Sequence, residues 1–281
     1  MIVTRFAPSP TGYLHLGHAY AAIAAQNASQ DGRFLLRIED IDLVRARPEF
    51  EAAIYEDLAW LDLRWEEAVL RQSTRFAAYR AALDRLDSQG LLYPCFCSRA
   101  EIAAEIARAS EAPYGPEGAI YPGTCRGLDA EIRSSRIASG TPYALRLDVA
   151  KAARRFGAIS FAEEGSGPAG ERGTIVADPL RFGDIVLARK EIPSSYHLAV
   201  VVDDAYQDVT LVTRGNDLFA ATDVQRLLQS LLELPAPHYA HHRLILDAQG
   251  RKYSKRDKAV TLRELRARGE TPQTIRARFG N

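Results

Sequence analysis

The start of the chain combines a short strand-like run, a turn and a helical segment, and this order restricts the possible folds. Ile2 to Phe6 reads as a short buried strand, and Pro8-Ser-Pro-Thr-Gly12 predicts a turn directly after it. His18 to Gln26 is rich in alanine, with apolar residues at helical spacing, and Phe34 to Ile38 predicts a second strand. A strand, a helix and a second strand in this order are typical of a parallel sheet, so we expect an α/β fold.

The same alternation returns in the second half of the chain. The apolar run from Leu198 to Asp203 predicts a strand covered on both faces, and Val209 to Thr213 predicts another strand. A helix is expected from about Asp223 to Glu233, followed by a last strand near His242 to Leu246. We therefore expect one doubly wound, Rossmann-like parallel sheet that is interrupted in its middle.

The interruption is expected between Cys95 and Pro193, where the sequence pattern changes. A capping box, Ser98-x-x-Glu101, predicts the start of a helix, and short alternating segments further on predict strands. We therefore expect this block to be an insertion. The predicted division is 1–94 for the first half of the main domain, 95–193 for the insertion, 194–246 for the second half, and 247–281 for a loop and a short helical C-terminus.

Composition places the chain among ordinary globular proteins. Of its 281 residues, 47% are hydrophobic and 26% are charged. The sequence has no apolar run that approaches the roughly 20 residues needed to span a bilayer. Its first residues also lack the basic-then-apolar layout of a secretory signal. We expect a cytoplasmic protein that acts as a monomer and has no membrane partner.

Charges are distributed unevenly although the net charge is zero. Ile38 to Ala68 holds ten acidic and three basic residues, whereas Arg251 to Asn281 holds ten basic and three acidic residues. A basic C-terminus can contact the phosphates of a nucleic acid. The same pattern is equally typical of a helix face whose arginines point to water, so both interpretations stay open.

Two short motifs near the chain ends carry residue types suited to phosphate chemistry. His15 and His18 flank Gly17 at the expected start of a helix, where free N–H groups and the positive dipole end favour anions. The pair could instead bind a metal or cap the helix. Lys255, in the polar segment Arg251-Lys-Tyr-Ser-Lys-Arg-Asp-Lys258, is suited to bind pyrophosphate. The alternative for this segment is a solvated basic loop.

Both motifs in this order resemble those of the class I aminoacyl-tRNA synthetases, in which His-x-Gly-His and Lys-Met-Ser-Lys-Ser bind ATP. Three further segments resemble the glutamyl branch of that class. They are Arg5-Phe-Ala-Pro-Ser-Pro-Thr-Gly12, Leu36-Arg-Ile-Glu-Asp-Ile-Asp42 and Arg214-Gly-Asn-Asp217. The chain departs from the family pattern at Tyr253 and Arg256, but it keeps Lys255.

The resemblance implies a set of site residues for Mg-ATP and L-glutamate. Two arginines that bind carboxylates and one carboxylate that pairs with an ammonium suit a glutamate substrate. An ion pair between Arg5 and Glu39 is the alternative for those two residues. The implied catalytic residues are His15, His18 and Lys255; the implied ATP-binding residues are His15, Gly17, His18, Lys252, Ser254 and Lys255; and the implied glutamate-binding residues are Arg5, Phe6, Ala7, Pro8, Ser9, Glu39, Tyr196 and Arg214.

The three cysteines suggest a metal site within the insertion. Cys95 and Cys97 are one residue apart, and Cys125 follows Tyr121 by four residues. Zinc prefers four ligands, so three thiolates leave one position that a phenolate can fill. The resemblance implies one structural zinc ion held by Cys95, Cys97, Tyr121 and Cys125. Three buried free cysteines are the alternative.

The length of chain after the second motif suggests a particular subfamily. Only 25 residues follow Arg256, whereas a glutamyl-tRNA synthetase carries a further anticodon-binding region there. The chain therefore resembles the truncated paralogues called glutamyl-queuosine tRNA(Asp) synthetases. That resemblance implies ATP-dependent activation of L-glutamate and its transfer to queuosine in tRNA(Asp). The alternatives are a minimal synthetase that charges the 3′ end of tRNA(Glu), a cofactor nucleotidyltransferase, and a catalytically silent tRNA-binding protein.

Overall fold

The computed structural model describes residues 1–281 except 67, 109–112, 248–249, 251–259 and 280–281. The strands are β1 Val3–Phe6, β2 Arg33–Ile38, β3 Leu70–Arg71, β4 Leu92–Cys95, β5 Tyr114–Gly115, β6 Gly118–Ala119, β7 Ala144–Leu147, β8 Ser160–Glu163, β9 Gly173–Val176, β10 Val186–Ala188, β11 Leu211–Gly215 and β12 His238–His242. The helices are α1 Leu16–Ser29, α2 Pro48–Trp60, α3 Phe76–Ser88, α4 Arg99–Arg108, α5 Ala130–Ala138, α6 Val149–Ala153, α7 Tyr196–Tyr206, α8 Ala221–Leu231, α9 Leu262–Ala267 and α10 Pro272–Ala277.

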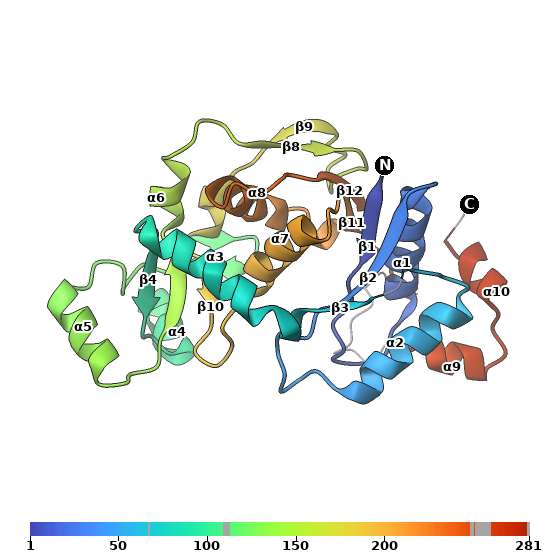
Figure 1. The fold of residues 1–281 in the computed structure, drawn as a ribbon, viewed down its shortest axis with the longest axis horizontal. Helices are drawn as coiled ribbons and strands as arrows, with labels where there is room; N and C mark the ends of the chain where they lie inside the picture. Colours follow the sequence, from blue (N-terminus) through green and yellow to red (C-terminus); the bar gives the residue numbers. More distant parts are fainter. Residues whose placement is uncertain (67, 109–112, 248–249, 251–259, 280–281) are drawn as a thin grey trace.

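Parallel strands from both halves of the chain form the centre of the fold. β1 pairs in parallel with β2, and β2 with β3, while β11 pairs in parallel with β12. The N–H of Thr210 donates to the carbonyl of Val3 at 3.0 Å, so the two sets of strands lie side by side (Figure 1). The predicted α/β fold is therefore confirmed, with β1, α1 and β2 forming the expected strand-helix-strand unit.

The sheets are mixed rather than wholly parallel. β8 pairs in parallel with β12, whereas β9 pairs antiparallel with β8. A separate antiparallel sheet has the order β10-β7-β4. β8 and β9 lie within residues 95–193 and extend the central sheet, while β4 begins at Leu92 and helps to build the separate one. Residues 95–193, which the sequence predicts to be an insertion and which are called the insertion below, thus contribute strands to two sheets.

The capping box predicted at the start of α4 has the expected hydrogen bonds. The N–H of Glu101 donates to Ser98 Oγ at 3.1 Å, and the N–H of Ser98 donates to Glu101 Oε2 at 2.6 Å. Each residue thereby satisfies a main-chain donor that the first helical turn leaves without a partner. This local signal placed the helix start correctly without any tertiary information.

Two predicted strands are wrong, and burial explains both errors. Leu198 to Asp203 forms part of helix α7, whose Leu198 and Ala199 are fully buried. An apolar run that is covered on every side has no polar face, so its periodicity does not distinguish a helix from a buried strand. The last strand is His238–His242 rather than His242 to Leu246. Because three of its residues are histidines, the sequence does not indicate that Tyr239 and His241 face the core.

The C-terminal helices pack against the N-terminal half of the chain. Leu262 and Leu265 of α9, with Ile275 and Phe279, belong to the same apolar core as residues of α1 and α2. Figure 1 shows α9 and α10 beside α2, although they lie at opposite ends of the sequence. Arg266 extends to Glu56 of α2 at 3.6 Å, so part of the basic C-terminus faces acidic residues.

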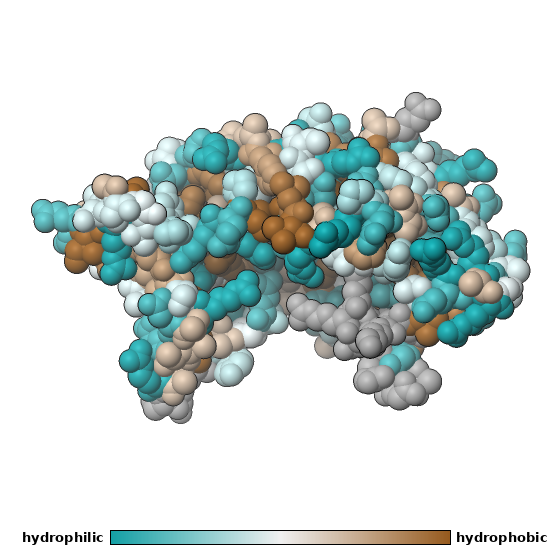
Figure 2. Space-filling view, turned by 90° about the horizontal axis from the view of Figure 1, so that it is seen from below, coloured by the Kyte–Doolittle hydropathy of each residue, from teal (hydrophilic) through white to brown (hydrophobic). Residues whose placement is uncertain are grey.

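None of the helices in the described residues combines the length and the apolar character needed to cross a membrane. Figure 2 shows one face of the molecule, seen from below, with mostly hydrophilic residues on its surface. The insertion projects at the left of this view, and the surface beside it is hollowed.

Candidate active site

One cavity of about 340 Å³ lies where the carboxyl ends of β1, β2 and β11 meet the N-terminus of α1. Polar groups gather there because neighbouring parallel strands end at the same edge of a sheet. The cavity collects every residue predicted for glutamate or ATP that the structure describes. These residues are Arg5, Phe6, Ala7, Pro8, Ser9, His15, Gly17, His18, Glu39, Tyr196 and Arg214.

Arg5 and Glu39 each pair with a residue that sequence reasoning missed. Arg5 Nε donates to Asp204 Oδ1 at 2.9 Å, and its Nη2 donates to Oδ2 at 3.3 Å. Arg37 Nη1 reaches the same carboxylate at 2.8 Å, and its Nη2 lies 3.4 Å from Glu39 Oε1. The alternative of an ion pair between Arg5 and Glu39 is therefore not the observed pairing. β1, β2 and α7 are instead joined by a buried network of four charges.

The two carboxylates in this network differ in how readily they ionise. Burial opposes the charge on Asp204, but Arg5 and Arg37 outweigh it and hold the pKa of that carboxyl below its usual value. At Glu39 the effect of burial is larger than the opposing effects of Arg37 and Arg5, so the pKa of this carboxyl lies above its usual value. Asp204 is thus satisfied by the protein, whereas a ligand ammonium would further stabilise the charged form of Glu39.

The loop after β1 is held against the end of β2. The N–H of Glu39 donates to the carbonyl of Pro8 at 3.0 Å, which places Ala7 and Ser9 beside the Glu39 carboxylate. Tyr196, the first residue of α7, lines the same cavity. Burial raises the pKa of its phenol, although Arg214 acts in the opposite direction. Tyr196 is therefore a neutral hydrogen-bonding group at neutral pH.

Arg214 is buried in β11, and the described part of the chain supplies no carboxylate to its guanidinium. Its three nitrogens donate to neutral acceptors: His241 Nε2 at 3.0 Å, Gln225 Oε1 at 2.7 Å and Thr222 Oγ1 at 2.6 Å. The side chain is thereby fixed in position while its positive charge stays uncompensated. A buried guanidinium of this kind is suited to bind a ligand carboxylate.

His241 connects Arg214 to a second buried residue, Glu163 of β8. His241 Nδ1 lies 2.6 Å from Glu163 Oε2, and both side chains are fully buried. Since Nε2 accepts from Arg214, the proton of the neutral ring is on Nδ1 and points to Glu163. Burial lowers the pKa of His241, and Arg214 lowers it further against the opposing effect of Glu163. A neutral imidazole thus separates the two charges.

The two motif histidines lie together at the N-terminus of α1. The N–H of His15, the N-cap residue, donates to His18 Nδ1 at 3.2 Å, and the two ring centroids are 3.7 Å apart. The first turn of α1 contains no acidic residue. Gly17 lies in that turn and lines the same cavity. The positive end of the helix dipole therefore faces the cavity beside two imidazoles, an arrangement that favours phosphate oxygens.

The predicted residues Lys252, Ser254 and Lys255 lie outside the described residues. The segments on either side of them, however, border the cavity. His242 and Ile245 line it on the preceding side, and Thr261 forms an antiparallel bridge with His15 on the following side. The main-chain N–H of Leu262 also donates to the carbonyl of Leu14 at 2.8 Å.

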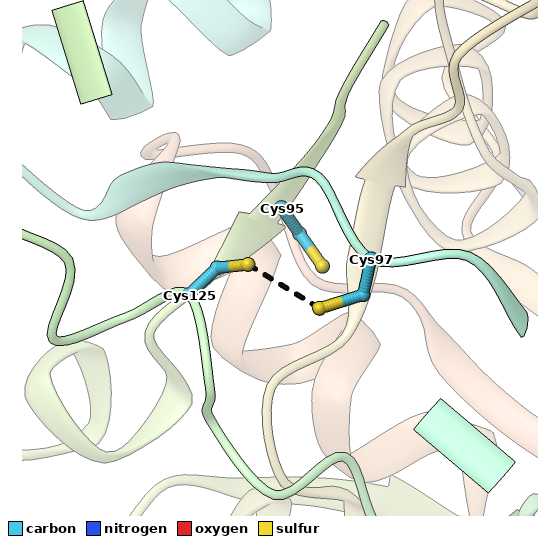
Figure 3. Close-up of side chains that lie close together, drawn as sticks. All are labelled: Cys95, Cys97 and Cys125. Carbon is cyan, nitrogen blue, oxygen red and sulfur yellow. Dashed lines mark hydrogen bonds between the residues drawn. The ribbon is translucent and has the colours of Figure 1, made fainter. Parts of the chain in front are cut away.

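The three cysteines converge in the insertion, as Figure 3 shows. Their sulfur atoms all lie within 4.8 Å of one another, and Cys97 Sγ is 3.4 Å from Cys125 Sγ. Zinc–sulfur bonds of about 2.3 Å at tetrahedral angles place sulfur atoms about 3.8 Å apart. The cluster therefore has the dimensions of a three-thiolate metal site.

Tyr121 lies beside the same cluster with its oxygen facing the sulfurs. Its Oη is 3.4 Å from Cys95 Sγ and 3.7 Å from Cys97 Sγ, and it accepts the N–H of Cys125 at 2.9 Å. The guanidinium of Arg146 lies 3.8 Å from the ring centroid of Tyr121. Three sulfurs and one phenol oxygen thus form a donor set that fits zinc. Without a metal, burial raises the pKa of Cys97 to about 11, so binding must displace its proton.

Sequence reasoning missed the four buried partners Arg37, Asp204, Glu163 and His241. Two of them lie in or next to an apolar segment: Arg37 lies within Phe34–Ile38, and Asp204 closely follows a run of valines. Since a buried charge needs a partner, a charged residue at such a position was the signal that could have found these two. Glu163 and His241 lie in polar surroundings in the sequence, which gave no such signal.

Comparison with known proteins identifies the family. A model described as tRNA synthetases class I (E and Q), catalytic domain, matches residues 1–280. The chain belongs to the class I tRNA synthetases. This membership confirms the resemblance drawn from the two ATP motifs, and it shows that the chain is a ligase of the aminoacyl-tRNA synthetase type.

Several relatives within this family are named glutamyl-Q tRNA(Asp) synthetase. A protein of Rhodobacter capsulatus named glutamyl-Q tRNA(Asp) synthetase is 49% identical, and the match covers 99% of this chain and 100% of the relative. One of the same name from Symbiobacterium thermophilum is 41% identical over 98% of this chain and 84% of the relative. These matches confirm the resemblance to the glutamyl-Q branch.

Glutamate–tRNA ligases match over a part of their length. The structure of glutamate-tRNA synthetase from Elizabethkingia anophelis superimposes with a TM-score of 0.74 and 30% identity. That match covers 92% of this chain and 53% of the other chain, so the chain spans about half of that relative. The likeness includes the class I fold with its mixed sheets.

Proposed function

We propose that the chain activates L-glutamate with ATP and transfers the glutamyl group to queuosine at the wobble position of tRNA(Asp). The observation that carries this proposal is the single cavity that joins a carboxylate site, an ammonium site and a phosphate site. Arg214 supplies the first, Glu39 the second, and the N-terminus of α1 with His15 and His18 the third. Relatives named glutamyl-Q tRNA(Asp) synthetase, matched over nearly the whole chain, support the choice of acceptor.

Glutamate binding follows from the charges in the cavity. Arg214 has only neutral hydrogen-bond partners, so a substrate carboxylate would neutralise its positive charge. Arg5 is already paired with Asp204, and it therefore acts chiefly by orienting the cavity wall. The ammonium of glutamate pairs with Glu39, and Tyr196 supplies a neutral hydroxyl.

In the first step, the α-carboxylate of glutamate attacks the α-phosphorus of Mg-ATP. A carboxylate oxygen–phosphorus bond forms while the bond to pyrophosphate breaks, giving glutamyl-adenylate. His15 and His18 stabilise the charge that develops on the phosphoryl oxygens. We assign Lys255, with Lys252 and Ser254, to the leaving pyrophosphate, which the position of the neighbouring Thr261 beside His15 supports.

In the second step, a hydroxyl of the modified nucleoside attacks the carbonyl carbon of the adenylate. The new ester bond forms as AMP leaves with the electrons of the cleaved carbon–oxygen bond, and the proton of the hydroxyl passes to the phosphate of the departing AMP. An extruded nucleoside in a single-stranded loop can reach a pocket in this way.

We also propose that Cys95, Cys97, Tyr121 and Cys125 bind one structural zinc ion. The converging sulfurs and the phenol oxygen between them support this assignment. A structural metal in this position would fix the insertion against β4, which supplies Cys95.

Two assays on the purified protein test the proposed function. Glutamate-dependent exchange of pyrophosphate into ATP should be detectable, and Arg214→Lys should reduce it because lysine cannot reproduce the three fixed hydrogen bonds. Labelled glutamate should then appear on tRNA(Asp) that contains queuosine and not on queuosine-free tRNA(Asp). Label on the 3′ end of tRNA(Glu) would instead establish the minimal glutamyl-tRNA synthetase, and absence of exchange would reject activation altogether.

A further inference from the structure

The position of the Glu39 carboxylate depends on the backbone on either side of it. Arg37 Nη2 lies 3.4 Å from Glu39 Oε1. That separation is longer than the about 2.7–2.9 Å of a strong charge-assisted hydrogen bond. Residues 39–42 follow β2 without regular secondary structure, and the carbonyl of Pro8 holds the N–H of Glu39. The ammonium site therefore depends on whatever fixes the chain directly after Glu39.

Asp40, the next residue, is anchored to a short 3-10 helix, Gln72–Arg75. Asp40 Oδ1 accepts the N–H of Ser73 at 2.8 Å, and Asp40 Oδ2 accepts the hydroxyl of Ser73 at 2.6 Å. Asp40 is 8% exposed, so these two bonds are largely shielded from water. Neither residue lines the active-site cavity, meaning the cavity of about 340 Å³ described above, so a substrate bound there does not contact them.

The same 3-10 helix is fixed to α7 through Asp203. Gln72 Nε2 donates to Asp203 Oδ2 at 3.0 Å, and Arg75 Nε donates to Asp203 Oδ1 at 3.1 Å. The hydroxyl of Tyr79 in α3 donates to Asp203 Oδ2 at 2.6 Å. The Asp203 side chain has no exposed surface, and a carboxylate buried in this way needs such donors. The 3-10 helix is therefore held at both of its ends by one residue of α7.

These contacts connect Glu39 to α7 by two separate routes. α7 begins at Tyr196, which lines the active-site cavity, and Asp204 of α7 binds Arg37, which precedes Glu39 in the chain. The second route runs from Asp40 through the 3-10 helix to the same helix α7. A binding group that is fixed on both sides keeps its geometry when the site fills, which is what the positioning of a substrate requires.

We propose that Asp40 and Ser73 are positioning residues for the ammonium site, because their two hydrogen bonds hold the Glu39 carboxylate where it pairs with the substrate amine. The proposal rests on the proposed function, since Glu39 has an ammonium to bind only if the substrate is an amino acid. The hydrogen bonds described for Asp40 and Ser73 do not extend to Arg214 or to the N-terminus of α1. Loss of these bonds should therefore weaken recognition of the amino group alone.

Two stable sulfamoyl analogues of glutamyl-adenylate test this assignment, one with the amino group and one without it. Their binding to the purified protein is measured by isothermal titration calorimetry. Affinity for the amino-bearing analogue should fall about fivefold in Ser73→Ala, which loses one hydrogen bond, and at least about tenfold in Asp40→Ala, which loses both. Affinity for the deamino analogue should stay within about twofold of the wild type in both variants, because its binding does not use Glu39.

Ser88→Ala and Asp40→Asn are the controls. Ser88 is exposed in α3, where its hydroxyl donates to the carbonyl of Arg85 at 2.9 Å, so its replacement should change neither affinity. Asp40→Asn removes the charge but keeps an oxygen that accepts from Ser73, and it should retain most of the affinity for the amino-bearing analogue. Equal losses in Asp40→Asn and Asp40→Ala would overturn the positioning role, by showing that the charge of Asp40 acts rather than its hydrogen bonds.

The outcomes separate this proposal from the proposed function. Absence of glutamate-dependent pyrophosphate exchange in the wild type would reject glutamate activation, while the two analogues would still decide the positioning role. Equal losses for both analogues would overturn that role, by showing that Asp40 and Ser73 only stabilise the fold. Unchanged affinities in both alanine variants, or a wild type that does not prefer the amino-bearing analogue, would also overturn it. If Asp40→Ala does not fold, Ser73→Ala decides alone, since it keeps the main-chain hydrogen bond.

Discussion

At the scale of single residues, the site depends on charged side chains that the protein buries and pairs. Arg37 is fully buried, and it is stabilised by Asp204 and Glu39. Glu163 is equally buried, and His241 connects it to Arg214. Removing one member of such a group leaves a buried charge uncompensated, which costs about 3–5 kcal/mol. We infer that these partners set the position of the arginines that face the substrate.

His241→Leu tests this role at the level of substrate binding. The change removes the acceptor of Arg214 Nε, so the guanidinium loses its orientation. We expect the KM for glutamate in pyrophosphate exchange to rise at least about tenfold, equivalent to about 1.4 kcal/mol, with a smaller change in kcat. His241→Gln retains an acceptor for Arg214 and should restore part of the affinity.

His238→Leu is the matched control for this prediction. His238 lies on the same strand, but it is exposed and pairs with exposed Glu164 at 2.5 Å. Its replacement should leave the KM for glutamate unchanged. A wild-type KM in His241→Leu, accompanied only by a lower Tm, would show that His241 stabilises the fold without positioning Arg214.

At the scale of elements, local signals succeeded where the chemistry was local. The turn Pro8-Ser-Pro-Thr-Gly12 and the capping box of Ser98 predicted the ends of a strand and of a helix correctly, because turns and caps act over a few neighbouring residues. Leu198 to Asp203 was assigned wrongly because α7 is enclosed by other elements. Its environment, rather than its own pattern, decides between helix and strand.

The metal site belongs to the element scale, since a loop brings Cys125 to the end of β4. We expect about one equivalent of zinc in the purified protein, measured by elemental analysis. Cys95→Ser should lose the metal, and chelation of the wild type should lower its Tm, because binding energy contributes directly to folding.

Tyr121→Phe and Tyr143→Phe form a matched pair for the fourth ligand. Tyr143 packs against the same cluster, but the described contacts do not place its hydroxyl at the sulfurs. Zinc affinity should fall in Tyr121→Phe alone. Full metal content in Cys95→Ser would exclude the site, and equal affinity in both tyrosine variants would exclude Tyr121 as a ligand.

At the scale of the whole molecule, the C-terminal helices pack against the N-terminal half of the chain. α9 and α10 cover α2, and the buried carboxyl of Asp57 lies where they pack. Its Oδ2 has no hydrogen-bond partner. Burial raises the pKa of Asp57 to about 6, although Arg266 and Arg263 of α9 oppose this effect and Glu56 adds to it.

Asp57→Asn should therefore stabilise the protein in a pH-dependent way. Between pH 4 and 6 the folded state holds a proton that the unfolded state has lost, so ionisation of Asp57 reduces stability as the pH rises. The gain in unfolding free energy from the substitution should be about 2 kcal/mol larger at pH 7.5 than at pH 4.5, as measured by urea denaturation.

Asp62→Asn is the control for this prediction, since Asp62 follows the same helix and its side chain is 79% exposed. It should show no such pH dependence. An equal gain for Asp57→Asn at both pH values would show that Asp57 ionises normally in the folded protein.

Local patterns, such as a strand followed by a turn and a helix, were sufficient to predict the α/β class from the sequence. The residues of the active-site cavity were predicted from the resemblance to the class I synthetases, which rests on the motifs that hold them. Three features became evident only in the folded chain: the pairing of Arg5 with Asp204, the position of His241 between Arg214 and Glu163, and the helical conformation of α7. The physical reason is that the pairing of buried charges depends on which distant segments share an interior, and neighbouring residues in the sequence do not encode that choice.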